Sequence, residues 1–329
     1  MGNKLIFTLI ASCALLVQGN PAMAKAQQKH HHKAVKVAQK ARIHKEFHAH
    51  KPQRVHSKQE DDELTNLVME KAGTSPRLYS NIALVYDAES HRPLYAKNAD
   101  TVAPIASITK LMTAMVVLDA NLPMDEPITI SEADVDTLKG THSRMRPGMT
   151  LTRAEMLKLA LMSSENRAAC ALARTYPGGT AAAVAKMNEK ARALGMTSTR
   201  FLEPSGLNSN NVSTAQDLVR MVDAADNYAL IHEFTTTASH VVTPAGYRTM
   251  QYNNTNPLVK NASWDIGVSK TGFINEAGRC LVMEANIQGR PIIMVLLDSQ
   301  GKQTRVGDAA RVKKWMESSE SRIRPTRNI

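Results

Sequence analysis

Aromatic residues and cysteines are scarce in this sequence, and each shortage limits what the chain can be. Aromatic residues make up 4% of the 329 positions and hydrophobic residues 43%, so Ala, Leu, Val and Met must fill most of any core. Cys13 lies in an N-terminal apolar run, which leaves Cys170 and Cys280 for the folded part. Their spacing does not suit a metal site. We expect free buried thiols, although an oxidising compartment would permit a disulfide.

Long hydrophobic runs are also missing, apart from one at the N-terminus. Lys4 precedes an apolar run over residues 5–17, and residues 22–24 (Ala-Met-Ala) have the pattern of a signal-peptidase site. This predicts a signal peptide over 1–24, cleaved after Ala24, with a lipoprotein signal around Cys13 as the alternative. The run is too short to span a bilayer comfortably, so we expect no transmembrane anchor and a periplasmic protein.

An excess of charge of one sign is confined to a short segment. The formal net charge is +11, but residues 25–58 hold ten Lys or Arg and one acidic residue, whereas residues 59–329 hold 30 and 29. The nearly neutral body argues against a nucleic-acid partner. Residues 25–64 also contain a His run at 30–32 and four further histidines. We expect a disordered linker there, with metal capture or adhesion to anionic groups as alternatives.

Internal repeats are absent, and the predicted elements change in type along the chain. An acidic stretch opens a helix expected over 60–71. Beyond it, strands are expected at both ends of the body, over 81–87, 93–97, 280–287 and 291–298. Helices are expected between the two groups of strands, over 107–120, 152–162, 165–175, 180–194 and 214–226, and after the last strand, over 303–317. This order predicts an α+β domain over 65–320, with an antiparallel sheet built from both chain ends, followed by a flexible tail over 321–329.

Ser107 and Lys110 lie three residues apart at the start of the helix predicted over 107–120. Positions i and i+3 share a helix face, so the serine hydroxyl and the lysine amine can meet. A serine hydroxyl is a weak nucleophile that needs a neighbouring base, and a neutral lysine amine can act as one. The pair suggests a nucleophile with its base, although such a pair also occurs by chance.

Ser164 and Asn166 follow the helix predicted to end near Met162. Two polar side chains placed two residues apart in a loop can direct a hydroxyl and an amide into one cleft. Both residue types are also good helix caps. Without its companions this motif would therefore predict a cap rather than a site.

Lys270, Thr271 and Gly272 follow a strand-like stretch over 266–268. A strand with these residues at its edge can place a cation and a hydroxyl beside the nucleophile. Gly272 would let another segment approach closely, because it has no side chain. The alternative interpretation of this motif is an ordinary strand end.

The three motifs in this order are the signature of penicillin-binding proteins and class A β-lactamases. The surrounding sequence resembles the low-molecular-mass penicillin-binding proteins of the D-alanyl-D-alanine carboxypeptidase (S11) family, most closely its D-alanyl-D-alanine endopeptidase branch (the penicillin-binding protein 7 type), at residues 104–114, 161–169, 199–201, 254–256 and 270–273. The resemblance covers residues 75–317. It implies a β-lactamase/transpeptidase-like α+β fold, with an antiparallel sheet flanked by helices and an inserted all-helical region.

The resemblance implies a catalytic role for the residues of the first two motifs. Ser107 would attack the D-alanine carbonyl and become acylated. Lys110 would accept its proton and would be kept neutral by repulsion from the cation of Lys270. Ser164 and Asn166 would relay a proton and hold the substrate amide. No cofactor and no metal are implied.

The same resemblance implies a substrate-binding role for Lys270, Thr271, Gly272 and Phe273. Thr271 would hydrogen-bond the substrate, and the backbone N–H groups of Phe273 and Ser107 would form the oxyanion hole. The implied partners are peptidoglycan stem peptides and β-lactams, with other wall enzymes as further candidates.

Two positions depart from the carboxypeptidase pattern. Glu165 stands where those relatives commonly have Gly, and Thr255 occupies the slot of an Arg that helps to bind the terminal carboxylate of D-Ala-D-Ala. Loss of that Arg should weaken selection for a free chain end. We therefore expect cleavage of D-alanyl cross-links, with weak carboxypeptidase activity. The chain stops soon after its last predicted helix, so we expect no additional C-terminal domain.

Three alternatives remain at this point. A D-Ala-D-Ala carboxypeptidase would use the same residues on free chain ends. A β-lactamase would need a Glu placed to hydrolyse the acyl-enzyme, and the nearest sequence match, 203–208, is one residue too long and is predicted to be a turn. An inactive wall-binding module would not need the full set of motif residues that is present.

Overall fold

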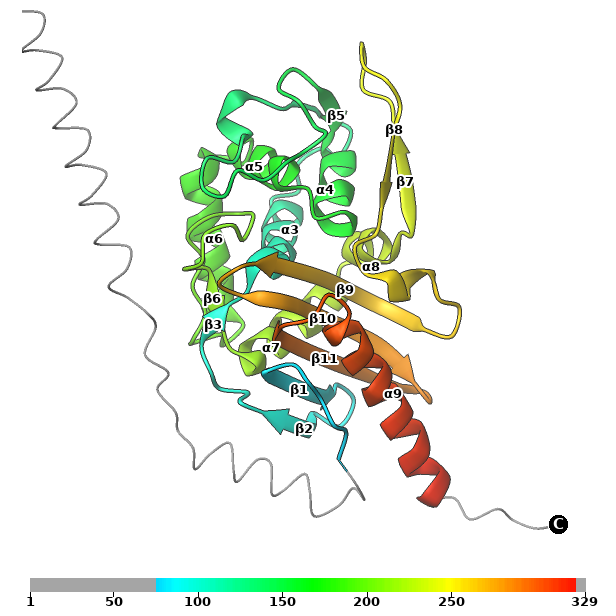
Figure 1. Ribbon diagram of the computed structural model, residues 1–329. Helices are drawn as coiled ribbons and strands as arrows, with labels where there is room; N and C mark the ends of the chain where they lie inside the picture. Colours follow the sequence, from blue (N-terminus) through cyan, green and yellow to red (C-terminus); the bar gives the residue numbers. More distant parts are fainter. Residues whose placement is uncertain (1–74, 324–329) are drawn as a thin grey trace, which may run out of the picture. The chain divides into compact units, whose positions relative to one another are not determined.

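The computed structural model describes residues 75–323, in which an antiparallel sheet is packed between helices (Figure 1). Its five strands run in the order β2-β1-β11-β10-β9. Two of them come from the start of the described chain and three from its end: β1 (Ile82–Asp87), β2 (Arg92–Lys97), β9 (Asp265–Ile274), β10 (Gly278–Ile287) and β11 (Arg290–Ser299). The prediction of an α+β fold with a sheet built from both ends is confirmed.

The helical region inserted between the two parts of the sheet is also confirmed. It contains α3 (Thr109–Asp119), α4 (Arg153–Met162), α5 (Asn166–Arg174), α6 (Gly179–Ala193), α7 (Ala215–Asp226) and α8 (Ala229–Thr236). The prediction missed α8 and the hairpin that follows it, because these elements are too short to show a clear hydrophobic period. Short paired strands link the helices: β3 (Ala103–Pro104), β4 (Pro127–Thr129), β5 (Thr150–Thr152), β6 (Val212–Ser213), β7 (Ser239–Val242) and β8 (Met250–Asn253).

Side-chain caps explain where two of the helices begin. Thr152 accepts a hydrogen bond from the backbone N–H of Glu155, and the Glu155 carboxylate accepts one from the backbone N–H of Thr152. This is a capping box. Thr214 likewise accepts from the N–H of Asp217 at the start of α7. Such caps satisfy backbone donors that the helix itself leaves unpaired.

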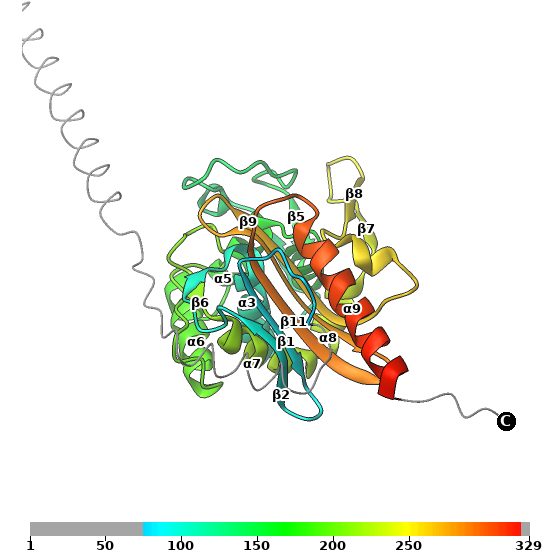
Figure 2. The same cartoon turned by 60° about the horizontal axis from the view of Figure 1, so that its bottom comes forward.

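The sheet separates two apolar layers. One face packs against α7 and α8, and the other is covered by the last helix, α9 (Thr304–Ile323), as Figures 1 and 2 show. Ala309, Val312 and Met316 of α9 join buried residues of β10 and β11 in the smaller cluster. The larger cluster is rich in Ala, Leu, Val and Met, as the low aromatic content requires. Both faces of the sheet are therefore buried, and β9 lies at its edge.

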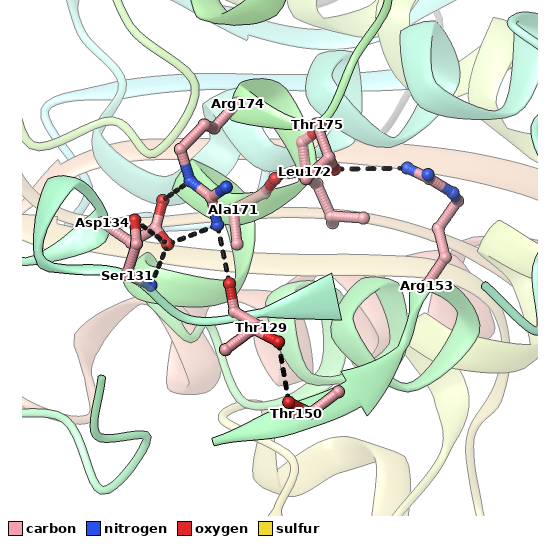
Figure 3. Close-up of polar contacts among 9 residues, drawn as sticks. All are labelled: Thr129, Ser131, Asp134, Thr150, Arg153, Ala171, Leu172, Arg174 and Thr175. Atoms are coloured by element: carbon pink, nitrogen blue, oxygen red, sulfur yellow. Dashed lines mark hydrogen bonds and ion pairs between the residues drawn. The ribbon is translucent and has the colours of Figure 1, made fainter. Parts of the chain in front are cut away.

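A partly buried ion pair connects α5 with the segment between β4 and β5 (Figure 3). Arg174, at the end of α5, donates from Nε and Nη2 to the two carboxylate oxygens of Asp134, each at 2.9 Å. Its Nη2 also donates to the carbonyl of Thr129 in β4. The side chain of Asp134 is 1% exposed and accepts from the N–H of Ser131. A two-pronged Arg–carboxylate contact of this kind holds its segments in a defined geometry.

Several predictions concern other parts of the chain. The signal peptide, the linker over 25–64, the helix over 60–71 and most of the tail over 321–329 lie outside the described residues. Within the described part, no helix is long and apolar enough to cross a membrane. Cys170 and Cys280 are both free, as expected, and burial raises the pKa of each thiol to about 12. Such thiols are poor nucleophiles at neutral pH.

Glu284 of β10 carries a destabilising charge at alkaline pH. A Cβ on Gly267 would lie 2.1 Å from Glu284 Oε2 and 3.1 Å from Asp226 Oδ1, so the two carboxylates share one region beside β9. Burial, and then the charge of Asp226, raise the pKa of Glu284 to about 7. The pKa of Glu284 in the folded protein lies above its value in the unfolded chain. Its contribution to folding stability is therefore complete below about pH 4.5 and is lost as the pH rises through about 7.

Replacing Glu284 by Gln should therefore stabilise the protein at alkaline pH. We expect Glu284→Gln to raise Tm at pH 8.5 by roughly 2–4 °C relative to the wild type, with a smaller difference at pH 5.5. Thermal unfolding across that pH range measures this. Glu89→Gln, at an exposed position, controls for the loss of one carboxylate. Equal shifts at both pH values would show that Glu284 does not titrate in this range.

Candidate active site

Lys110 contacts two other motif residues. Ser107 lies in the short 3-10 helix Ala106–Ile108 that leads into α3, and its Oγ is 2.9 Å from Lys110 Nζ. The same Nζ donates to Asn166 Oδ1 at 2.7 Å and to the carbonyl of Ser205 at 2.6 Å. The meeting of Ser107 and Lys110 that their spacing predicts is therefore found, and Asn166 joins them from α5.

The protonation of Lys110 is controlled by its burial. The residue is 1% exposed, and burial lowers its pKa to about 8, although the negative charge of Glu203 acts in the opposite direction. An appreciable fraction of the amine is therefore neutral near neutral pH and can accept a proton. Burial also lowers the pKa of Lys270 well below its usual value, followed by the charge of Lys110. The pKa of Lys110 is thus lowered mainly by burial rather than by the expected repulsion from Lys270.

Two glycines allow the backbone to enclose the nucleophile. Ala106, directly before Ser107, has a φ of 48°, a region that costs a non-glycine residue about 1 kcal/mol or more. Gly206 packs against it so closely that a Cβ there would lie 1.9 Å from Ala106 O. From β9, a Cβ on Gly272 would lie 3.0 Å from Ser107 N. The close approach predicted for Gly272 is therefore confirmed.

Ser164 and Lys270 form a second polar pair. Ser164 lies in the turn between α4 and α5 with a φ of 63°, and Lys270 lies in the middle of β9. Lys270 Nζ donates to Ser164 Oγ at 2.9 Å and to the carbonyl of Thr271 at 2.8 Å. The second and third motifs, more than a hundred residues apart in sequence, are thus in direct contact.

Thr271 and Phe273 flank Gly272 on β9. Thr271 Oγ1 donates to Thr255 Oγ1 at 2.6 Å, at the slot where the carboxypeptidase relatives are expected to carry Arg. The Phe273 side chain is 50% exposed, and the guanidinium of Arg279 lies 4.4 Å from its ring centroid. The candidate residues from all three motifs therefore gather around Ser107, on the 3-10 helix Ala106–Ile108 and α3, on the turn before α5 with the start of that helix, and on β9.

Sequence reasoning missed Arg305, in the first turn of α9. It is 8% exposed, and its charge helps to lower the pKa of Lys270. Within residues 75–323, its buried Nε has no hydrogen-bond partner. A cation in the first turn of a helix opposes the helix dipole. That unfavourable placement is the sequence signal that could have marked Arg305 as functional.

Sequence reasoning also missed the part that the segment 203–208 plays. Its Ser205 carbonyl binds Lys110, and Gly206 packs behind the nucleophile. Within this turn, the Glu203 carboxylate accepts from the N–H groups of Ser205 at 2.8 Å and Gly206 at 2.5 Å. The turn prediction is confirmed. A carboxylate used in this way is not placed to activate water, which argues against the β-lactamase alternative.

No cluster of three or more metal-binding side chains is found within residues 75–323. A surface hollow between the β1–β2 pair and α7 contains none of the motif residues, since it is lined by Leu84, Tyr86, Pro93, Gln216, Val219 and Arg220. The polar contacts around Ser107 therefore define the candidate site.

Comparisons with known proteins agree with this geometry. A family model described as D-alanyl-D-alanine carboxypeptidase (peptidase S11) matches residues 69–301. D-alanyl-D-alanine endopeptidases of Pseudomonas aeruginosa and Escherichia coli are 49% and 46% identical to this chain, over 74% of it and 79% of each relative. The crystal structure of the Streptomyces K15 DD-transpeptidase matches with a TM-score of 0.70 and 29% identity, over 75% of this chain and all of that one. The chain belongs to the peptidase S11 family.

Proposed function

We propose that this chain is a serine DD-peptidase of peptidoglycan and that its main reaction is endopeptidase cleavage of D-alanyl cross-links. The observation that carries the proposal is the 2.9 Å contact between Ser107 Oγ and the buried Nζ of Lys110, whose pKa is lowered to about 8. An amine in this state can accept a proton from the serine hydroxyl as it attacks a carbonyl. The names of the similar endopeptidases support the same reaction.

The proposed reaction passes through an acyl-enzyme. Ser107 Oγ attacks the D-alanyl carbonyl carbon while its proton passes to Lys110, and the N–H groups of Ser107 and Phe273 hold the oxyanion. The C–N bond then breaks, and the departing amine takes up a proton. That proton is the one that Lys110 accepted, and Ser164, which contacts Lys270 Nζ, is suited to relay it. Water hydrolyses the ester and restores Ser107. A β-lactam would acylate the same hydroxyl.

The positive end of the site suits a carboxylate next to the departing amine. Arg305 supplies a buried cation there, Lys270 supplies a buried amine, and Thr271 supplies a hydroxyl. The side chain at the Arg slot, Thr255, is hydrogen-bonded to Thr271 and carries no charge. Because this slot lacks the guanidinium of an Arg, a free terminal carboxylate is bound more weakly. This favours a cross-linked substrate over a pentapeptide end.

Defined muropeptides test the proposed preference. We expect purified wild-type protein to convert cross-linked dimers to monomers at least about tenfold faster than it removes D-alanine from pentapeptides, since a lost charged hydrogen bond is worth about 1.5–3 kcal/mol. Mass spectrometry of the products measures both reactions. Ser107→Ala is the inactive control. Intact dimers together with trimmed pentapeptides would favour the carboxypeptidase alternative.

We also propose that the mature protein acts in the periplasm. The proposal rests on the expected signal peptide and on the location of its substrate. N-terminal sequencing of protein recovered from a periplasmic extract should begin at Lys25. An intact Met1 would exclude cleavage after Ala24.

A further inference from the structure

The segment over residues 136–143, called the strap below, has no role in the mechanism described so far. It follows Asp134, which is held by Arg174 of α5 (Figure 3). Asp136 then organises the segment from within. Its carboxylate accepts from the N–H groups of Leu138, Lys139 and Thr141 at 2.7, 3.0 and 2.8 Å. The strap therefore has a defined backbone conformation.

One end of the strap is hydrogen-bonded to the motif that contains Ser164 and Asn166. Asn166 Nδ2 donates to Thr141 Oγ1 at 3.2 Å, and Ser143 Oγ donates to Glu165 Oε2 at 2.7 Å. Burial raises the pKa of Glu165. A glycine at position 165 would have no carboxylate for Ser143. The departure noted in the sequence thus ties the strap to the catalytic turn.

The other part of the strap reaches the opposite side of the site. Lys139 Nζ forms an ion pair with Glu276 in the turn between β9 and β10. Glu276 follows Phe273 by three residues, so it lies at most about 10 Å further along the chain. The strap therefore connects the start of α5, which carries Asn166, with the end of the strand that carries Lys270, Thr271 and Gly272, beyond the proposed oxyanion hole.

Two exposed apolar side chains lie at this end of the site. Leu138, next to Lys139, is 62% exposed, and Phe273 is 50% exposed. Lys270 lies three residues before Phe273 on β9 and contacts Ser164, and the departing amine and its carboxylate are proposed to lie on that side. The strap end of the site therefore faces the acyl-donor part of the substrate. A small penicillin is too short to fill this end of the site.

We propose that the strap determines peptide specificity, with Leu138 and Phe273 contacting the acyl-donor stem of a cross-linked peptide and the Lys139–Glu276 pair holding Leu138 in place. The inference rests on the proposed DD-peptidase function and adds the residues that recognise the longer substrate. An exposed ion pair supplies a small free energy, so its loss should change activity by about fivefold rather than abolish it.

Four variants separate the contact from the ion pair. Leu138→Ser removes the apolar contact, Lys139→Met and Glu276→Gln each break the pair, and the double variant Lys139→Glu/Glu276→Lys restores it with reversed charges. We expect each single variant to raise KM for muropeptide dimers about three- to tenfold. Acylation by fluorescent penicillin should stay within about twofold of wild type, and the double variant should recover dimer cleavage.

The outcomes distinguish this inference from the proposed function. Absent penicillin acylation in the wild type would refute the DD-peptidase function itself. Normal acylation with unchanged dimer KM in the single variants would refute the specificity role. Equal losses on dimers and penicillin would make the strap a purely structural element. A double variant no better than the single ones would show that the ion pair does not hold the strap.

Discussion

Replacing Lys110 by Arg is expected to slow acylation of Ser107 by fluorescent penicillin by about 10²–10⁴-fold. Arginine keeps the positive charge and much of the length, but its guanidinium does not lose a proton in proteins. It can therefore replace the charge of Lys110 but not its proposed role as base. Rates of adduct formation, read by gel fluorescence or mass spectrometry, measure the effect.

The pH dependence gives a second measure of the same role. Because burial lowers the pKa of Lys110 to about 8, the neutral fraction of its amine grows as pH rises through that value. Wild-type acylation should therefore rise with pH across this range, and Lys110→Arg should lack that rise. Lys158→Arg, at an ion pair with Glu233 outside the candidate site, controls for the exchange of residue type. An unchanged rise in Lys110→Arg would assign the base to another group.

Local features of the fold could be predicted because they depend on neighbours in sequence. The three-residue spacing of Ser107 and Lys110 predicts their contact on one helix face, and Thr152 with Glu155 predicts the start of α4. Four of the five strands of the sheet could be recognised, whereas only residues 266–268 of the ten-residue strand β9 were described as strand-like. In contrast, α8 is eight residues long and gives a weak pattern.

The contacts that complete the site depend on tertiary structure. Nothing near Lys270 indicates Ser164 as its partner, and nothing near Lys139 indicates Glu276. The resemblance to a family placed the motifs together, but it did not reveal Arg305 or the strap. Burial decides the pKa of Lys110, and burial is a property of the whole fold. The sequence could therefore name the reacting groups but not their electrostatic state.

Replacing Gly206 by Ala should remove most of the activity, although the change adds only one methyl group. The new Cβ would lie 1.9 Å from Ala106 O and 2.8 Å from Ser107 N, and the φ of +86° is unfavourable for Ala. The backbone before Ser107 must then move away. Because a displacement of about 1 Å in reacting groups can cost 10²-fold, we expect acylation by penicillin to fall at least about 100-fold.

A second glycine separates backbone strain from the clash. Gly195 has a φ of +73°, but a Cβ there would have its nearest neighbour at 3.9 Å. Gly195→Ala should therefore lose stability of about 1–2 kcal/mol through conformational strain and keep its acylation rate. Gly206→Ala should lose both stability and acylation rate, as measured by thermal unfolding and by adduct formation. Full activity in Gly206→Ala would mean that Ser107 does not depend on the packing of the 203–208 turn against Ala106. The position of the nucleophile would then be set by β9 alone, through Gly272.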